Sequence, residues 1–138
     1  MKNLVLALAL FLIAFTAKAQ EETVMVKVTI ENVLNDKGTL LVSLHSNETF
    51  MKGPGLIDLK EVAVKGAVSF TFEDVKPGAY AVMVLHDEND NQRMDFETNG
   101  MPKESYGMSG NAMSMGPPTF EDAKFEVANE DMELTIRF

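Results

Sequence analysis

The stretch Val24-Met25-Val26-Lys27-Val28-Thr29-Ile30 alternates valine or isoleucine with methionine, lysine and threonine. Successive side chains of a β-strand point to opposite faces, so this pattern predicts a strand with one buried face and one solvated face. Turn chemistry follows at Asn35-Asp36-Lys37-Gly38, where Gly38 can take a positive φ. Residues 39–46 form the next apolar run. We therefore expect an antiparallel hairpin from these two strands.

Further short strands are predicted along the rest of the chain. The segment 80–86 is apolar at both alternating sets of positions, which is typical of a central strand. No segment has a convincing amphipathic helical pattern. The fold class that follows is all-β: an antiparallel β-sandwich of about seven strands, immunoglobulin- or transthyretin-like, with one long loop at one end. The remaining predicted strands are residues 59–64, 68–72, 124–128 and 133–138, and the long loop is residues 99–118.

The first nineteen residues have the pattern of a secretory signal peptide. Lys2 precedes an apolar run over residues 4–15, and Ala17-Lys18-Ala19 forms a small-residue cleavage site. The alternative, a membrane anchor, would need roughly 20 apolar residues. We expect cleavage, a periplasmic or extracellular location, no membrane span in the mature form, and a single β-sandwich domain over residues 20–138.

The charge of the predicted mature chain excludes one class of partner. Removal of residues 1–19 leaves 10 of the 12 basic residues against 21 acidic ones, a formal charge of −11. Nucleic acids are bound by clustered lysine and arginine, so no nucleic-acid partner is expected. The chain has no cysteine and can form neither disulfides nor thiolate metal sites. A protein or small-molecule partner at the cell envelope, of unknown identity, is the remaining expectation.

An acidic loop follows the predicted central strand and places oxygen-bearing side chains at alternate positions. In an EF-hand loop the ligands come from positions 1, 3, 5, 7 and 9, with position 7 supplying its backbone carbonyl. Five residues fall on these positions: Asp87, Asn89, Asn91, Arg93 through its carbonyl, and Asp95. A donor set made only of oxygens favours Ca²⁺ over softer metals. The sequence therefore predicts a calcium site, in which Asp87 and Asp95 supply the negative charge.

Two positions depart from that pattern. Gln92 occupies position 6, where the sharp turn requires glycine, and Thr98 occupies position 12, where a bidentate glutamate completes the shell. Glu97 lies one residue before position 12, so it could complete the shell only if the path of the loop differed. The alternative is a metal-free turn, because Asp and Asn side chains also cap turns by bonding to nearby backbone groups.

Two other functions remain open at this stage. A small hydrolase could use His86 with Glu104 as an acid/base pair, although a histidine beside an Asp/Asn loop more often orders that loop. A Cu(I)-binding protein could use clustered thioethers in the long loop. Methionine more often fills irregular gaps in a core. The thioethers in question belong to Met101, Met108, Met113 and Met115.

Four sequence motifs, taken in order, resemble a bacterial exported family known only as domain of unknown function 2141. They are Val75-Lys76-Pro77-Gly78-Ala79-Tyr80-Ala81-Val82, His86-Asp87-Glu88-Asn89-Asp90-Asn91 with Asp95, Gly100-Met101-Pro102-Lys103-Glu104-Ser105-Tyr106-Gly107, and Gly116-Pro117-Pro118-Thr119-Phe120-Glu121-Asp122-Ala123. The resemblance covers nearly all of the mature chain. It implies a fold and an exported compartment, and no established activity.

The chain departs from that family at two positions. Family members typically have glycine where this chain has Gln92, and often phenylalanine where it has Met108. The step Pro77-Gly78-Ala79-Tyr80 also resembles the entry to a strand in transthyretin-like and collagen-binding-protein B-type sandwiches. The resemblance therefore agrees with the β-sandwich that alternation predicts, and it weakens the analogy with a calcium loop at position 6.

Overall fold

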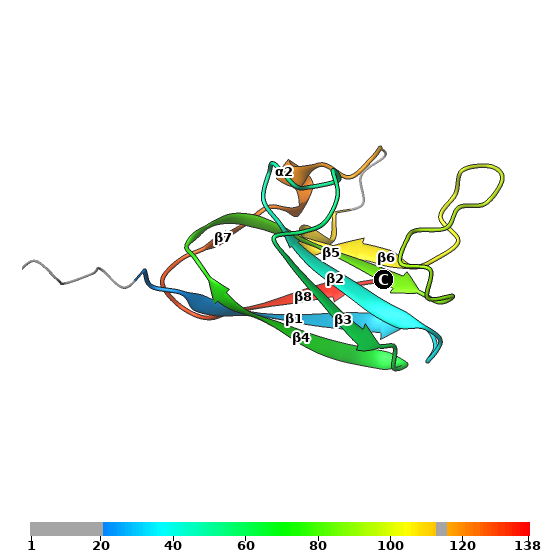
Figure 1. The fold of residues 1–138 in the computed structure, drawn as a ribbon, viewed down its shortest axis with the longest axis horizontal. Coiled ribbons are helices and arrows are strands. Elements are labelled where there is room, and N and C mark those ends of the chain that lie inside the picture. The colour runs from blue at the N-terminus through cyan, green and yellow to red at the C-terminus, as the bar shows by residue number, and fades with distance from the viewer. Residues whose placement is uncertain (1–20, 113–115) are drawn as a thin grey trace, which may run out of the picture.

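The computed structural model describes residues 21–112 and 116–138, which form two β-sheets packed face to face (Figure 1). The predicted signal peptide, residues 1–19, lies outside the described residues. One sheet has the strand order β4-β1-β8, and the other has the order β3-β2-β5-β6, with β7 paired to β5. In chain order the strands are β1 (Val24–Val33), β2 (Thr39–His45), β3 (Ile57–Val62), β4 (Gly66–Val75), β5 (Gly78–Asp87), β6 (Tyr106–Met108), β7 (Phe125–Val127) and β8 (Met132–Arg137).

The β-sandwich predicted from alternation is confirmed. All paired strands run antiparallel except β1 and β8, which pair in parallel from Val26 opposite Met132 to Glu31 opposite Arg137. A tight turn cannot join parallel neighbours. Here the two partners come from opposite ends of the domain, so the rest of the chain forms the connection.

The predicted hairpin between residues 24–30 and residues 39–46 is wrong. Strand β1 pairs with β4 and β8, whereas β2 pairs with β3 and β5 in the other sheet. Both strands present an apolar face to the same interior, because Val26, Val28 and Leu40 are all 0% exposed. The turn at residues 34–38 therefore carries the chain from one sheet to the other. The β3–β4 connection does the same.

Strand β5 is central, as predicted. It pairs with β2, β6 and β7, and both Ala81 and Val82 are fully buried although they point to opposite faces. The inner face of β5 contributes to the main core between the sheets, whose largest fully buried side chain is Phe72. Its outer face packs on a second apolar cluster that contains Phe50, Met108 and Ala123.

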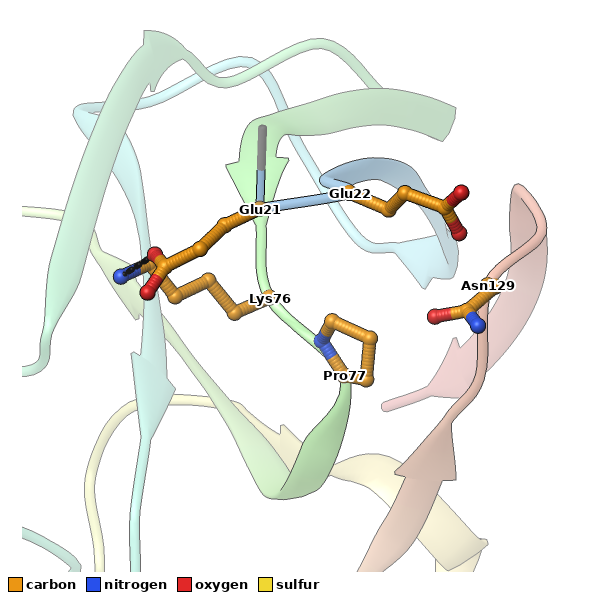
Figure 2. A pocket seen from close by; sticks show the side chains of 5 residues that line it. All are labelled: Glu21, Glu22, Lys76, Pro77 and Asn129. Atoms are coloured by element: carbon orange, nitrogen blue, oxygen red, sulfur yellow. Dashed lines mark ion pairs between the residues drawn. The ribbon is translucent and has the colours of Figure 1, made fainter. Parts of the chain in front are cut away.

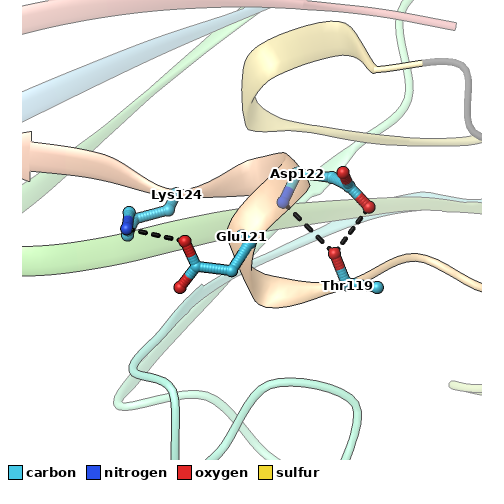
Figure 3. Close-up of polar contacts among 4 residues, drawn as sticks. All are labelled: Thr119, Glu121, Asp122 and Lys124. Atoms are coloured by element: carbon cyan, nitrogen blue, oxygen red, sulfur yellow. Dashed lines mark hydrogen bonds and ion pairs between the residues drawn. The ribbon is translucent and has the colours of Figure 1, made fainter.

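The short helix α2 (Phe120–Ala123) covers this second cluster. Thr119 is its N-cap, and the hydroxyl of Thr119 accepts a hydrogen bond from the Asp122 backbone N–H at 3.3 Å (Figure 3). Lys124 forms an ion pair with Glu121 at 2.8 Å. One helical turn is too short to show the 3.6-residue period, so the sequence did not indicate it. None of the helices in the described residues is long and apolar enough to cross a bilayer.

The segment predicted as one long loop, residues 99–118, contains regular structure. It includes β6 and a short 3₁₀ turn, η2 (Ser109–Asn111). Ser109 is 1% exposed and fixes this segment, because its hydroxyl accepts from the Val82 N–H at 2.9 Å and donates to the Ala123 carbonyl at 2.5 Å. The segment therefore packs against the sheet and α2 rather than hanging free.

Candidate functional site

Strand β5 ends in Asp87, the first residue of the acidic loop. Its side chain is 0% exposed, and its two carboxylate oxygens accept backbone N–H groups of the loop. One oxygen accepts from Asn91 at 3.1 Å and the other from Gln92 at 2.7 Å. A carboxylate that accepts backbone N–H bonds holds a turn in one conformation. Asp87 is thus the internal anchor around which the loop folds.

Three other predicted ligands converge on one point at the surface. The side-chain amides of Asn89 and Asn91 both donate to the same carboxylate oxygen of Asp95, at 2.6 and 2.9 Å. These two bonds, Asn89 first, hold the pKa of Asp95 below its usual value. A lowered pKa means that the bonds contribute stability above the ordinary pKa and lose it as pH falls through the folded-state value. The structure therefore brings Asp87, Asn89, Asn91 and Asp95 into one connected loop.

The loop turns twice through the left-handed region. Asp90 has φ +58° and Gln92 has φ +62°. Gln92 occupies the position where the EF-hand pattern requires glycine, and it adopts the backbone conformation that makes glycine favourable there. The backbone N–H of Arg93 donates to the Asn91 side-chain oxygen at 3.1 Å. Gln92 thus takes a positive φ at position 6, which glycine would adopt at lower cost.

Replacing Gln92 with glycine is expected to raise the free energy of unfolding by about 0.5–1 kcal/mol. Removal of the β-carbon relieves a left-handed conformation that costs roughly 1–2 kcal/mol, and the greater freedom of glycine in the unfolded chain offsets part of the gain. Urea unfolding of the two proteins in EDTA measures the difference. The control is Gln92→Ala, which keeps the β-carbon. An equal gain in the alanine variant would show that the strain is not at φ.

Glu104 closes the loop from outside its own sequence. It is 7% exposed, and its two carboxylate oxygens accept the backbone N–H groups of Glu88 at 3.0 Å and Asp95 at 3.1 Å. Between Asp95 and Glu104 the chain forms a small hairpin, in which Lys103 N–H donates to the Asp95 carbonyl at 2.8 Å. Glu104 therefore joins the two ends of the acidic loop, a role that sequence spacing did not indicate.

The β1–β2 turn supports the other side of the loop. The Thr39 hydroxyl donates to the Asp90 carboxylate, and His86 Nε2 lies 2.7 Å from the Lys37 carbonyl oxygen. Gly38 makes the closest approach, since a β-carbon built there would lie 2.0 Å from the Asp87 carbonyl oxygen. Only glycine fits between the turn and the loop.

His86 and Glu104, the pair considered for a hydrolase, are both buried. His86 is 0% exposed and stacks on Phe138 with the ring centroids 6.2 Å apart. Its Nε2 donates to the Lys37 carbonyl oxygen, and its Nδ1 is buried without a hydrogen-bond partner in the described residues. Both side chains bind backbone groups, His86 the Lys37 carbonyl of the β1–β2 turn and Glu104 two N–H groups of the acidic loop, which is a structural use of these residues.

The methionines considered for Cu(I) are divided between two environments. Met101 is 61% exposed on the hairpin that follows the acidic loop, whereas Met108 is 6% exposed within the second apolar cluster. Met113 and Met115 lie outside the described residues. Met108 packs there beside Phe50 and Ala123, which is the usual role of methionine in an irregular apolar gap.

The arrangement of acidic side chains limits how a metal ion could be held. In residues 21–112 and 116–138 no group of three or more His, Cys, Asp or Glu side chains could hold a metal ion. A calcium ion at the loop would thus depend on two carboxylates together with amide and backbone oxygens.

A shallow pocket lies at the opposite end of β5, where Lys76 forms an ion pair with Glu21 beside Pro77 (Figure 2).

Comparison with known proteins gives a family and no activity. A family model described as an uncharacterized protein conserved in bacteria (DUF2141) matches residues 28–135. No curated protein matches the chain. Among solved structures, the pilus-presented adhesin Spy0125 (Cpa) aligns over 87% of this chain and 27% of its own, with 13% identity and a TM-score of 0.34, so this chain spans about a quarter of that adhesin's length. Because the family model covers most of the chain, this protein belongs to the bacterial family DUF2141.

Proposed function

We propose that this protein is an exported, non-enzymatic binding or structural module of the bacterial cell envelope whose acidic loop binds Ca²⁺. The observation that carries the proposal is the convergence of Asn89, Asn91 and Asp95 above the buried carboxylate of Asp87. The loop is held from outside by Glu104 and by the β1–β2 turn. A site built in this way is largely formed before any ligand arrives, which reduces the cost of binding.

The donor set fits a hard cation. A carboxylate has about four lone-pair sites, so Asp87 can accept two backbone N–H bonds and still face an ion. Asn89 and Asn91 each carry one side-chain oxygen, and the Arg93 carbonyl adds a further oxygen. With two charged and several neutral oxygens, the loop matches the flexible coordination of Ca²⁺ better than the strict octahedron of Mg²⁺. When bound, the cation would supply the positive charge that the amide N–H groups now present to Asp95.

Calcium binding would stiffen the end of the sandwich that carries a hairpin with two exposed apolar side chains. The hairpin after Asp95 presents Phe96 at 57% and Met101 at 61% exposure. Its first strand begins at Asp95, and its last residue is followed by Glu104. An ion held by Asp95 would therefore fix the base of a hairpin that offers apolar side chains to a partner.

Thermal unfolding of residues 20–138 is expected to shift with Ca²⁺ and not with Mg²⁺. A ligand at about one hundred times its dissociation constant adds roughly 2.7 kcal/mol, which corresponds to a rise in Tm on the order of 10 °C for a domain of this size. The Asp95→Asn variant should lose the calcium-dependent rise, because the charge that would bind the ion is removed. Its Tm in EDTA should change little, because Asp95 is partly exposed at the surface.

The matched control is Glu97→Gln, which removes the same charge two residues away and outside the ligand positions. Its calcium response should equal that of the wild type. A calcium response that survives in Asp95→Asn, or one that both variants lose equally, would contradict a specific site and indicate general screening of the acidic surface. An unchanged Tm in the wild type with every ion would reduce the loop to metal-free turn chemistry.

A further inference from the structure

Strand β3 is an edge strand whose second side has no partner among the described residues. It pairs only with β2, and it forms the end of the four-stranded path β3-β2-β5-β6 (Figure 1). Its C-terminal half is open to solvent, with Val62 at 71% exposure. A free β edge presents unpaired N–H and C=O groups that can continue the sheet with another strand.

The hydrogen-bond pattern of β3 fixes which residues face the free edge. Ala63 N–H donates to the Gly38 carbonyl of the strand-entry turn at 3.1 Å, so the backbone of Ala63 faces β2. Residues alternate along an antiparallel ladder, which directs the backbone groups of Val62, Lys60 and Asp58 away from β2. These three residues would bond a new strand, and Leu59 between them would occupy a non-hydrogen-bonded position.

The side chains on the outer face of β3 form a pattern that is complementary to itself. Asp58, Lys60 and Val62 alternate on this face and are all exposed. Leu56 precedes the strand, and its backbone N–H donates to the Leu44 carbonyl of β2 at 2.7 Å, so it is not part of the free edge. Asp58 and Lys60 carry opposite charges on either side of Leu59. When a second copy is laid antiparallel with the two-fold axis at Leu59, Asp58 faces Lys60. Each contact occurs twice, as a two-fold interface requires.

The individual side chains are free to make these contacts. Lys60 forms no ion pair in the described part of the chain, and Asp58 uses one carboxylate oxygen to accept the Gly55 N–H at 3.0 Å. On the inner face, Leu59 packs against the main core and would meet its own symmetry mate. Edge charges on natural sheets often prevent association. Charges that prevent two β3 edges from pairing would be of like sign where they meet. Asp58 and Lys60 are of opposite sign and attract each other.

We propose that β3 mediates a two-fold homodimer by antiparallel pairing of β3 with β3 of a second copy, centred on Leu59. The sheet β3-β2-β5-β6 of one copy then continues across the interface into the same sheet of the other copy. The occupant is a second copy of this chain because the order of opposite charges at Asp58 and Lys60, on either side of Leu59, matches its own reverse. The interface is small and exposed, so we expect a dimer Kd between about 1 µM and 1 mM.

Charge reversal with rescue tests the register in solution. Sedimentation equilibrium of residues 20–138 in EDTA should show a monomer–dimer equilibrium for the wild type. Lys60→Asp places acids opposite acids and should raise the dimer Kd by at least about tenfold. The double variant Asp58→Lys with Lys60→Asp restores both pairs in reversed polarity and should return the Kd towards that of the wild type. Lys37→Asp, which makes the same change outside β3, should have no effect.

A cysteine cross-link tests the two-fold axis independently of affinity. Non-hydrogen-bonded antiparallel pairs bring Cα atoms to about 4.5 Å, within the range that a disulfide spans. Because the chain has no cysteine, Leu59→Cys should form one disulfide-linked dimer on oxidation, and Glu61→Cys, on the same face but off the axis, should not. A wild type that remains monomeric up to about 1 mM, a failed double-variant rescue, or equal cross-linking at both positions overturns the proposal.

Discussion

Replacing Gly38 with alanine is expected to lower the free energy of unfolding by about 3 kcal/mol or more and to displace the acidic loop. The new β-carbon would lie 2.0 Å from the Asp87 carbonyl oxygen and 2.7 Å from the Glu88 Cα, and both of these are backbone atoms. Gly38 also has φ +64°, which costs an alanine roughly 1–2 kcal/mol. Overpacking adds typically 1–3 kcal/mol. Urea unfolding in EDTA measures the loss.

The control separates the steric contact from the backbone conformation. Gly100 has φ +83°, and a β-carbon there would meet nothing within 4 Å. Gly100→Ala should therefore cost only the conformational part, about 1 kcal/mol. If the two alanine variants lost the same stability, the β1–β2 turn would not press against the acidic loop, and the coupling between the two segments would be disproved.

The strands could be predicted from the sequence because each one buries a face, and burial leaves a period of two. Strand β5 shows this most clearly, since its apolar residues on both faces correspond to the main core and the second cluster. Strand partners could not be predicted in the same way. The turn at residues 35–38 has the same chemistry in a hairpin and in a connection between sheets. What distinguishes the two is the interior shared by Val28 of β1 and Val42 of β2.

The parallel pairing of β1 with β8 could not be predicted from short-range sequence patterns either. Alternation in residues 24–30 predicts a half-buried strand whatever its neighbour. The partner is chosen by contacts between residues more than a hundred positions apart, such as Val28 with Leu134. No turn signal records a contact of that kind, because the two strands are not joined by a turn.

Within the candidate site, sequence spacing predicted the local part and missed the supports. Asp87, Asn89, Asn91 and Asp95 interact through neighbours two to six residues apart, and such contacts follow from the order of residues. Glu104 reaches the loop from the far side of a hairpin. Its assignment as a possible acid/base group reflected its residue type, whereas its buried position and its two backbone N–H partners come only from the fold.

The fold also explains why the acidic residues of this loop are not equivalent. Five acids lie close together in sequence, yet one of them, Asp87, is fully buried and holds the backbone, and another, Asp95, is partly exposed and holds two amides. Burial decides what each carboxylate costs to remove, because water replaces the bonds of the partly exposed one more readily than those of the buried one.

Asp87→Ala is accordingly expected to lower the free energy of unfolding by about 2–5 kcal/mol, even without calcium. The substitution removes the acceptor of the Gln92 N–H and one of the two acceptors of the Asn91 N–H, which also donates to the Asn89 side-chain oxygen at 3.2 Å. Each group left unsatisfied costs about 1–3 kcal/mol. Hydrogen exchange should localise the loss, with faster exchange at these two amides.

Asp87→Asn keeps the shape of the side chain and one carbonyl oxygen, so it should recover part of the stability. Asp95→Ala should lower the free energy of unfolding in EDTA far less than Asp87→Ala does, since water can replace the bonds that Asp95 makes at the surface. Equal losses for Asp87→Ala and Asp95→Ala would mean that the loop has no internal anchor, and the calcium site proposed above would lose its preformed geometry.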